Sequence, residues 1–204
     1  MKHLILNIIF ISTGLIGLVQ CHISNDIKPP QIPIDQLQPG DIAFRRGEGV
    51  TSSIVLHNDA DGKYSHVGIV VKYNGQSMIV HSVPNDDPKQ KDIIQLENIE
   101  SFFSPKSARN GEIKRMELDS IQKVQLNNYA LEKVTQKIPF DHDYNLSDTT
   151  ELYCTELVQL LYQRIGINIS EGRITSINVP GMSGNYIMPA DIYHNSKLKK
   201  IFIY

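Results

Sequence analysis

The sequence lacks an excess of positive charge. It has 20 lysine and arginine residues against 22 aspartate and glutamate residues, and its formal net charge is −2. It also has no arginine-rich run and no basic stretch interleaved with aromatic residues. Proteins that bind nucleic acid neutralise phosphates with clustered lysine and arginine side chains. The composition therefore argues against nucleic acid as a partner.

Internal repeats, low-complexity tracts and an alternation of strand and helix patterns are also lacking. The absence of repeats argues against solenoid architectures, and the absence of βαβ alternation disfavours a parallel sheet. A chain of 204 residues suffices for one domain with a hydrophobic core and is short for two. With 41% hydrophobic and 21% charged residues, the composition is that of an ordinary globular protein.

Cysteine is scarce, because the chain has two, Cys21 and Cys154. Cys21 follows a positively charged start at residues 1–3 and an apolar run over 4–19. This pattern is typical of a secretory signal, and the run is short for a membrane span. A retained N-terminal anchor helix is the alternative interpretation. We assign 1–21 as a signal peptide and expect an exported protein in the periplasm or cell envelope of a bacterium.

Cys21 stands where a bacterial lipoprotein signal places its lipidated residue, although Gln20 departs from the small residue usual before it. Two outcomes remain open: lipidation, which would attach the protein to a membrane, and simple cleavage nearby. Either outcome leaves Cys154 without a disulfide partner. A free thiol in an exported protein is usually reactive or paired between chains. The alternative is a small hydrophobic side chain in the core.

Turn signals and hydrophobic periodicity place the predicted strands early in the chain and the long helices late. Residues 22–36 are rich in proline and predict an extended tether to a domain over 37–204. Strand patterns before helix patterns indicate an α+β fold. Strands are expected at 41–45, 65–72, 77–83, 92–96, 113–118 and 198–204, one helical turn near 54–56, a short helix at 97–103, and a loop-rich segment at 166–189.

Two longer helices follow the early strands. The first is predicted from Asp119, as N-cap with Gln122 three residues on, to the residue before Pro139. The second ends at Gly166 and carries Cys154 in its first turn. The apolar residues at helical spacing are Ile121, Val124, Leu131, Val134 and Ile138 in the first, and Leu157, Leu160, Leu161 and Ile165 in the second.

Residues 65–83 predict a β-hairpin, because Asn74 and Gly75 are a strong signal for a two-residue turn. A two-residue loop sets Gly68 opposite His81. His66 and His81 are then diagonal neighbours on one face, about 7–8 Å apart at Cα. Gly68 has no side chain to block their approach. A slip of one residue would abolish this geometry.

The candidate chemistry combines a thiol with an imidazole. Cys154 is the candidate nucleophile, since a helix N-terminus favours a thiolate. His66 is the candidate base, and His81 either orients the His66 ring or is a histidine at a sheet edge. Tyr64, two residues before His66, is either an oxyanion donor or a packed aromatic residue. Glu156 suits a structural hydrogen bond, because it lies on another face of the helix from Cys154.

Two other interpretations compete with this one. Asp141, His142 and Asp143, together with His57 and Asp148, could form a metal cluster, but they lack the paired spacing of a zinc site. A solvated loop is the simpler interpretation, so we predict no metal and no other cofactor. The second alternative is a binding domain without activity. In such a domain Cys154 would be a buried structural cysteine. It would resist alkylation at neutral pH, whereas an activated thiol would not.

Several motifs together resemble the YiiX-type enzymes. These are circularly permuted papain-like cysteine hydrolases, related to NlpC-type cell-wall peptidases and to lecithin retinol acyltransferase. The resemblance covers roughly 37–204, almost the whole mature chain. Its motifs are 37–42 (LQPGDI), 64–69 (YSHVGI), 140–144 (FDHDY), 153–158 (YCTELV) and 189–192 (PADI).

The resemblance implies a permuted papain-like fold, with an antiparallel sheet packed against helices. It also implies Cys154 as nucleophile and His66 as base, whereas many relatives have an acidic residue where His81 stands. The implied activity is acyl transfer through an acyl-enzyme. Together with export, this favours an amide substrate such as a cell-wall peptide. Lipid acyl chemistry, by a hydrolase, acyltransferase or thioesterase, is the alternative, because a fold alone does not decide the substrate.

Overall fold

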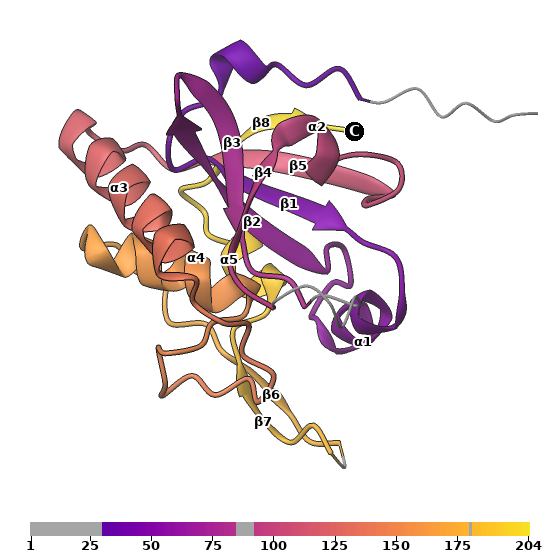
Figure 1. The fold of residues 1–204 in the computed structure, drawn as a ribbon. Helices are drawn as coiled ribbons and strands as arrows, with labels where there is room; N and C mark the ends of the chain where they lie inside the picture. Colours follow the sequence, from indigo (N-terminus) through magenta and orange to yellow (C-terminus); the bar gives the residue numbers. More distant parts are fainter. Residues whose placement is uncertain (1–29, 85–91, 180) are drawn as a thin grey trace, which may run out of the picture.

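The computed structural model of the chain describes residues 30–84, 92–179 and 181–204. Its main body is an antiparallel sheet of six strands in the order β4-β3-β2-β1-β5-β8 (Figure 1). The strands are β1 (Ile42–Arg46), β2 (His66–Tyr73), β3 (Gln76–His81), β4 (Gln95–Asn98), β5 (Asn110–Arg115) and β8 (Lys199–Ile203), and a separate hairpin is formed by β6 (Thr175–Ile177) and β7 (Gly184–Tyr186).

Helices α2, α3 and α4 pack against this sheet, and α3 and α4 run side by side (Figure 1). None of the helices in the described ranges is long and apolar enough to cross a membrane. The helices are α1 (Val50–Asn58), α2 (Ile99–Phe102), α3 (Ser120–Gln136), α4 (Cys154–Arg164) and α5 (Pro189–Tyr193), preceded by a 3-10 turn, η1 (Ile34–Gln36).

The β2–β3 hairpin has the predicted register. Asn74 and Gly75 form its turn with φ angles of 49° and 80°, as both central residues of a type I′ turn require. One step beyond the last pair of the ladder, Gly68 stands opposite His81. His66 and His81 therefore share a face of the hairpin as diagonal neighbours. The paired residues are Tyr73 with Gln76, Lys72 with Ser77, Val71 with Met78, Val70 with Ile79 and Ile69 with Val80.

α1 is the element that the sequence underestimated. The segment expected to hold one helical turn is a helix of nine residues. It begins Val50-Thr51-Ser52-Ser53, and β-branched residues and serine have low helix propensity. None of its residues is fully buried, so no apolar stripe marks it in the sequence. Elsewhere β4 begins at Gln95 rather than at residue 92, and the loop-rich segment contains β6 and β7.

α3 has the predicted N-terminus but packs partly through another face. The predicted capping box is present, with Asp119 accepting from the Gln122 backbone at 2.8 Å. Leu126 is fully buried, whereas Ile121 and Val124 are 69% and 60% exposed. Ile121 and Val124 fit the helical spacing that predicted α3 but face solvent, because contact with the sheet and α4 selects the buried face. The later members of the predicted stripe, Leu131, Val134 and Ile138, do pack at the edge of the core.

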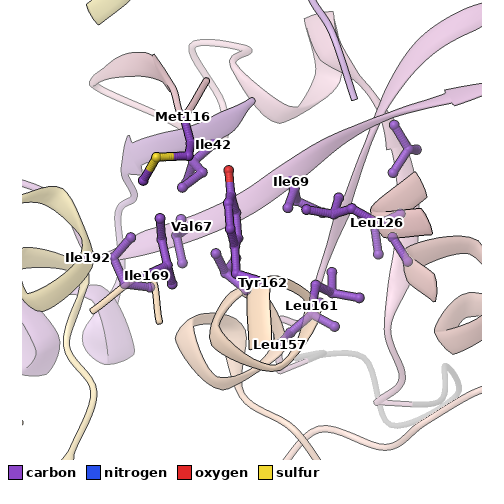
Figure 2. Packing of buried hydrophobic residues seen from close by; sticks show 14 of the residues in the cluster. Ile42, Val67, Ile69, Met116, Leu126, Leu157, Leu161, Tyr162, Ile169 and Ile192 are labelled. Atoms are coloured by element: carbon purple, nitrogen blue, oxygen red, sulfur yellow. The ribbon is translucent and has the colours of Figure 1, made fainter. Parts of the chain in front are cut away.

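The two faces of the main sheet bury separate apolar clusters. Alternate residues of β2 face opposite ways, so Ile69 packs beneath α3 and α4 while Val70 packs on the side of α2. Tyr162 of α4 stands in the first cluster, with its ring among aliphatic side chains (Figure 2). Its hydroxyl donates to the backbone oxygen of Gly40 at 2.6 Å, which ties α4 to the turn before β1.

The predicted signal peptide, 1–21, and most of the predicted tether, 22–36, lie outside the described residues. From residue 30 onward the chain packs against the domain instead of extending as a tether. η1 forms a turn there, and Ile32 and Ile34 contact the cluster on the α2 face of the sheet. The apolar side chains of these two residues explain the difference from the predicted tether.

Candidate active site

Cys154 is the first residue of α4, in agreement with the prediction that it lies in the first turn. The residue before it, Tyr153, is extended, and its backbone N–H donates to the Glu156 carboxylate at 3.2 Å. The predicted structural hydrogen bond of Glu156 is therefore confirmed. Because α4 packs against β2, its N-terminal turn lies close to the start of that strand, where His66 is.

The Cys154 thiol is partly buried and surrounded by backbone donors. The backbone N–H groups of Val67 in β2, of Thr155 and of Cys154 itself lie near its sulfur and favour the thiolate. Burial raises the pKa of the thiol to about 11, although these donors and the charge of Arg45 act in the opposite direction. The helix N-terminus thus favours the thiolate as predicted, but burial outweighs it. At neutral pH the thiol needs a base to become a nucleophile.

His66 and His81 contact each other directly, and the predicted diagonal contact is confirmed. His66 Nε2 lies 2.9 Å from His81 Nδ1, and the ring planes are 77° apart. This approach depends on Gly68. A Cβ at Gly68 would lie 2.5 Å from the Ile79 side chain, closer than packing tolerates, and 3.1 Å from the His81 Cβ, which is tighter than an ordinary contact. A glycine is therefore required between the two histidines.

Both imidazoles are buried, and their burial favours the neutral form. Burial lowers the pKa of His66 well below its usual value, and Arg45 and His81 lower it further. Burial also lowers the pKa of His81, against the opposing effect of the Glu97 carboxylate. Since Nε2 of His66 faces His81, its Nδ1 is the nitrogen left to accept a proton.

Glu97 and Arg45 are two charged residues of this site that the sequence did not single out. Glu97 Oε2 lies 3.1 Å from His81 Nε2 and 3.8 Å from Arg45 Nη1. Arg45 also donates to the Phe102 backbone oxygen at 2.9 Å, with its guanidinium 4.3 Å from the centroid of the Phe102 ring. The pairing of Arg45 with His66 in β1 and β2 could have indicated Arg45. The sequence did not indicate Glu97, because it predicted a helix at 97–103, whereas Glu97 belongs to β4.

Cys154 and His66 line one cavity of about 740 Å³. A cavity of this size accepts a small molecule or a segment of a chain. Polar groups reach it from Arg45, Lys106 and Asp143, among others. Its apolar side is formed by α1 and by the segment of β6 and β7, with Val50, Ile54, Ile177, Met182 and Ile187 in the wall.

Tyr144 is a further cavity residue to which the sequence gave no role. Its ring lies 5.3 Å from the Tyr153 ring and 5.9 Å from the Phe140 ring, measured between centroids. Burial raises the pKa of its hydroxyl, and an ionised Cys154 would raise it further, so the hydroxyl lies within electrostatic reach of the sulfur. The FDHDY motif contains Tyr144 and was the available signal.

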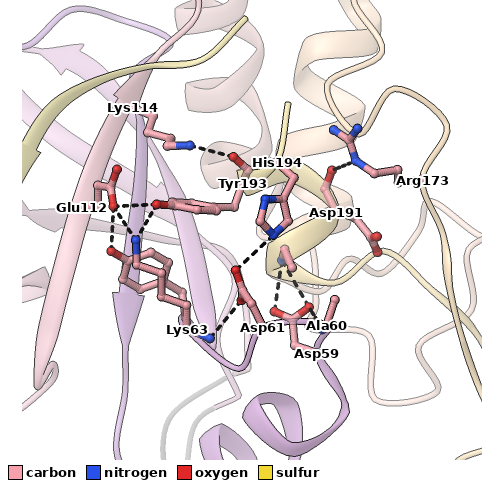
Figure 3. A network of polar contacts seen from close by, with 12 residues as sticks. Asp59, Ala60, Asp61, Lys63, Glu112, Lys114, Arg173, Asp191, Tyr193 and His194 are labelled. Atoms are coloured by element: carbon pink, nitrogen blue, oxygen red, sulfur yellow. Dashed lines mark hydrogen bonds and ion pairs between the residues drawn. The ribbon is translucent and has the colours of Figure 1, made fainter. Parts of the chain in front are cut away.

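Tyr64 is not part of this arrangement. Its hydroxyl donates to Glu112 Oε2 at 2.9 Å, in a cluster completed by Lys63 and Tyr193 (Figure 3). β2 begins only at His66, so the alternation of faces that predicted a shared side does not extend back to Tyr64. The structure gives no support to the predicted role of Tyr64 as an oxyanion donor, because its hydroxyl is bound to Glu112 and its side chain lies on the sheet face away from the two imidazoles.

The acidic segment before Cys154 shapes a loop. Asp141 accepts hydrogen bonds from three backbone N–H groups, at 2.8, 2.8 and 2.6 Å. His142 Nε2 lies 2.8 Å from Asp92 Oδ2, while His57 belongs to α1. In the parts of the chain that the structure describes, no group of three or more histidine, cysteine, aspartate or glutamate side chains is placed to hold a metal ion.

Comparisons with known proteins agree with this geometry. The profile of the family described as "Permuted papain-like amidase enzyme, YaeF/YiiX, C92 family" matches residues 36–202. The crystal structure of metalloprotein yiiX from Escherichia coli O157:H7 is similar with a TM-score of 0.68 and 18% sequence identity. The similarity covers 82% of this chain and 97% of that chain. The curated protein sequences contain no match.

The similarity to the solved structure concerns the fold, because its sequence identity is low. The fold is the predicted α+β one, an antiparallel sheet packed against helices in the permuted papain-like order. The family profile extends over the main sheet, the helices and the cavity. The chain accordingly belongs to the permuted papain-like amidases of the YaeF/YiiX, C92 family, which are cysteine hydrolases.

Proposed function

We propose that Cys154 is the nucleophile of a cysteine amidase, that His66 is its general base and that His81 orients the His66 ring. The family supplies the amidase class. The observation that carries the residue assignment is the 2.9 Å contact between His66 Nε2 and His81 Nδ1. It leaves Nδ1 of His66 for the thiol proton, and both residues line the same cavity.

The first half-reaction begins from a neutral thiol and a neutral imidazole. The Cys154 proton moves to Nδ1 of His66 while the sulfur forms a bond to the amide carbonyl carbon. The carbonyl π electrons move onto oxygen, where backbone N–H groups in the first turn of α4 stabilise the negative charge. The C–N bond then breaks, and the proton on His66 passes to the departing amine.

The second half-reaction releases the acyl group to water. His66 takes a proton from a water molecule as the water oxygen attacks the thioester carbonyl. The C–S bond breaks, the sulfur regains the proton from His66, and a carboxylic acid leaves. The cycle returns both groups to their neutral forms, in which the buried pair is most stable because burial disfavours the charged ones.

A peptide amide of the cell wall is the substrate class that we propose first. Charged groups of both signs line the cavity, including Arg45, Lys106 and Asp143, and such groups suit a peptide with free amino and carboxyl groups. The proposed export supports the same choice, because it places the enzyme in the compartment of that substrate. The export itself rests on the signal pattern at 1–21.

A lipid acyl substrate is the second candidate, and α1 favours it. Val50 and Ile54 are 78% and 39% exposed, and both line the cavity together with Met182. Exposed apolar side chains beside a nucleophile suit an acyl chain. Attachment to a membrane through a lipidated Cys21 would bring such a substrate within reach.

The test is hydrolysis of a defined panel by the mature chain. The panel contains a cell-wall peptide, an N-acyl amide, a thioester and a phospholipid ester. We expect cleavage of an amide, with kcat/KM lower by about 10³-fold or more in Cys154→Ala and by about 10²–10⁴-fold in His66→Ala. Preference for the phospholipid ester would favour the lipid candidate. An amide turnover equal in wild type and Cys154→Ala would refute the assignment.

The proposed localisation has a separate test. Cells that express the full chain are fractionated, and the mature N-terminus is identified by mass spectrometry, with Cys21→Ala for comparison. Lipidation predicts an acylated N-terminal cysteine in the membrane fraction, which the substitution moves or abolishes. An uncleaved chain in the cytoplasm would contradict export.

A further inference from the structure

We propose that Glu97 is a positioning residue of this site, which fixes the ring proton of His81 and through it makes His66 a base. The proposal rests on the cysteine-amidase function proposed above and concerns the same site. It adds a carboxylate behind His81, the neutral imidazole that orients the base. Glu97 is then two contacts away from His66.

Glu97 reaches His81 through the same strand geometry that brings His81 to His66. In the β3–β4 ladder Glu97 pairs with Ile79, two positions before His81, so Glu97 and His81 are diagonal neighbours on one face. The three side chains therefore cross three adjacent strands. His66 Nε2 lies 2.9 Å from His81 Nδ1, and His81 Nε2 lies 3.1 Å from Glu97 Oε2.

The carboxylate determines which nitrogen of His81 carries the proton. An ionised carboxylate only accepts, so the neutral His81 ring places its proton on Nε2, facing Glu97. His81 Nδ1 is then an acceptor, and it takes the Nε2–H of His66. This leaves the Nδ1 of His66 unprotonated, as a base for the Cys154 thiol must be. The opposite tautomer of His81 would put the His66 proton on Nδ1 and block that transfer.

The burial of His81 strengthens the effect of its contact with Glu97. Its side chain is 2% exposed, so its Nε2 has little access to water. The Glu97 oxygen approaches Nε2 at 3.1 Å but off the line of a regular hydrogen bond, and the interaction is therefore mainly electrostatic. In a buried site of low polarity such an interaction is stronger than in water. Removal of Glu97 would leave both tautomers of His81 accessible.

Arg45 keeps the carboxylate ionised. Burial opposes ionisation of Glu97, but the contact with His81 and the charge of Arg45 outweigh it and lower the pKa of the carboxyl. Arg45 Nη1 lies 3.8 Å from Glu97 Oε2. The ring of Phe102 packs against both imidazoles and the guanidinium, with centroid distances of 5.7, 5.3 and 4.3 Å. This ring shields the charges from water.

The charged groups near the two imidazoles are Arg45 of β1 and Glu97 of β4, and the titratable thiol of Cys154 in α4 lines the same cavity as His66. Arg45 disfavours an imidazolium at His66, whereas Glu97 favours one through His81. When the thiol proton reaches His66 Nδ1, the negative charge of Glu97 compensates the new positive charge through His81. Only one proton moves, and the Nε2–H of His66 stays in place.

The competing explanation is that Glu97 serves only as the counter-ion of Arg45. Both explanations predict that loss of Glu97 lowers activity if the fold loosens. They differ in the size of the fall in Cys154 reactivity at neutral pH, because a carboxylate that only balances Arg45 does not fix the tautomer of His81. They also differ in the protonation state of the histidine nitrogens.

The first experiment measures alkylation of Cys154 by iodoacetamide as a function of pH, read at the Cys154 peptide by mass spectrometry. The variants are Glu97→Leu, Glu97→Gln and Glu97→Asp, with the exposed neighbour Glu100→Gln as the matched control. We expect about a tenfold or larger fall at neutral pH for Glu97→Leu. For Glu97→Gln we expect a smaller fall and an acidic limb moved to lower pH, because a negative charge near His66 is lost.

The other two variants complete the first experiment. Glu97→Asp should restore part of the rate, and Glu100→Gln should behave as wild type. If Glu97→Leu reacts at the wild-type rate with an unchanged acidic limb, the proposal is overturned. A parallel His66→Ala sample separates this result from failure of the proposed function: a rate that does not depend on His66 refutes the amidase mechanism itself.

The second experiment needs no variant and so does not depend on folding of a mutant. Imidazole nitrogen chemical shifts of the wild-type protein report which ring nitrogens carry protons. The proposal predicts neutral rings at neutral pH, with protons on Nε2 of both His66 and His81. A His66 protonated on Nδ1 alone would overturn the proposal and leave the assignment of the nucleophile intact.

Discussion

Glu97 and Glu112 occupy opposite faces of the same sheet, and their surroundings are made of similar parts. Glu97 lies near a cation, Arg45, and an aromatic ring on the α2 face. Glu112 lies near a cation, Lys63, and two tyrosines on the other face. Both carboxylates have pKa values below the usual one, since their partners outweigh the effect of burial.

The two clusters differ in where their contacts lead. Glu112 is fully buried, and the groups that bind it, Lys63, Tyr64 and Tyr193, also contact one another. Glu97 instead begins a series of contacts through His81 and His66 toward the cavity of Cys154. Similar residues therefore stabilise the fold on one face and serve the proposed chemistry on the other. Connection to the nucleophile distinguishes them.

The largest expected effect is on stability, in the Glu112 cluster. Glu112→Leu removes the shared acceptor of two hydroxyls and one ammonium group, so we expect the free energy of unfolding to fall by about 2–4 kcal/mol. Activity per folded molecule should stay within about twofold of wild type. Denaturant unfolding and kcat/KM test this together. For Glu97→Leu we expect the reverse, a fall in kcat/KM with a smaller fall in the free energy of unfolding. Equal changes of both quantities in the two variants would refute the difference between the two clusters.

Glu156 is a buried carboxylate near other acids, and it sharpens the comparison. Burial raises its pKa to about 8, and Asp141 and Asp148 add to this effect. A raised folded-state pKa stabilises the protein below the usual glutamate value and loses this contribution as the pH rises through 8. Glu156→Gln mimics the protonated form. We expect it to match wild type at pH 5 and to be more stable by on the order of 1–2 kcal/mol at pH 9.

The control for Glu156 is the exposed surface carboxylate Glu132, whose replacement by glutamine should leave the difference between pH 5 and pH 9 unchanged. Thermal or denaturant unfolding at the two pH values gives the measurement. A Glu156→Gln variant that loses stability equally at both values would mean that the carboxylate is ionised in the native protein.

Arg45→Gln tests the electrostatic balance on the α2 face. The guanidinium lowers the pKa of His66, so its removal should raise that pKa and move the acidic limb of the kcat/KM profile to higher pH. We expect a shift of about one pH unit. The side chain of Arg109 is 68% exposed, and Arg109→Gln is the matched control with no shift expected. Movement of the limb to lower pH in Arg45→Gln would contradict the balance.

Tyr64→Phe carries the smallest expected effect. It removes one hydrogen bond to Glu112 while the ring stays in the core, so the free energy of unfolding should fall by about 1 kcal/mol. kcat/KM should be unchanged, because the hydroxyl lies on the other face from the imidazoles. A loss of kcat without a loss of stability would support the oxyanion role for Tyr64.

Local chemistry in the sequence was enough to predict the hairpin and the helix ends. Asn74 and Gly75 specify a turn, and the turn specifies which residues share a face, so the contact of His66 with His81 followed from counting. The first turn of α4 was predicted from apolar spacing. In each case a short segment determines its own geometry.

What the sequence could not indicate depends on contacts between distant segments. Ile121 and Val124 of α3 satisfied the helical period but face solvent, because contact with the sheet determines which side of a helix is buried. Glu97 acquires its partners only when β4 pairs with β3. The predicted face of Tyr64 was wrong for a related reason. The alternation of faces along a strand was applied to Tyr64, which precedes the start of β2 at His66.

The turn at Asn74 and Gly75 limits how the length of this protein can change. Surface loops usually tolerate insertions and deletions. Here one added or removed residue would shift β3 by one position against β2 and turn His81 to the opposite face. The turn lies at the end of the hairpin away from Cys154 and contacts no atom of the proposed reaction. Yet a change of a single residue in its length would remove the partner of the base.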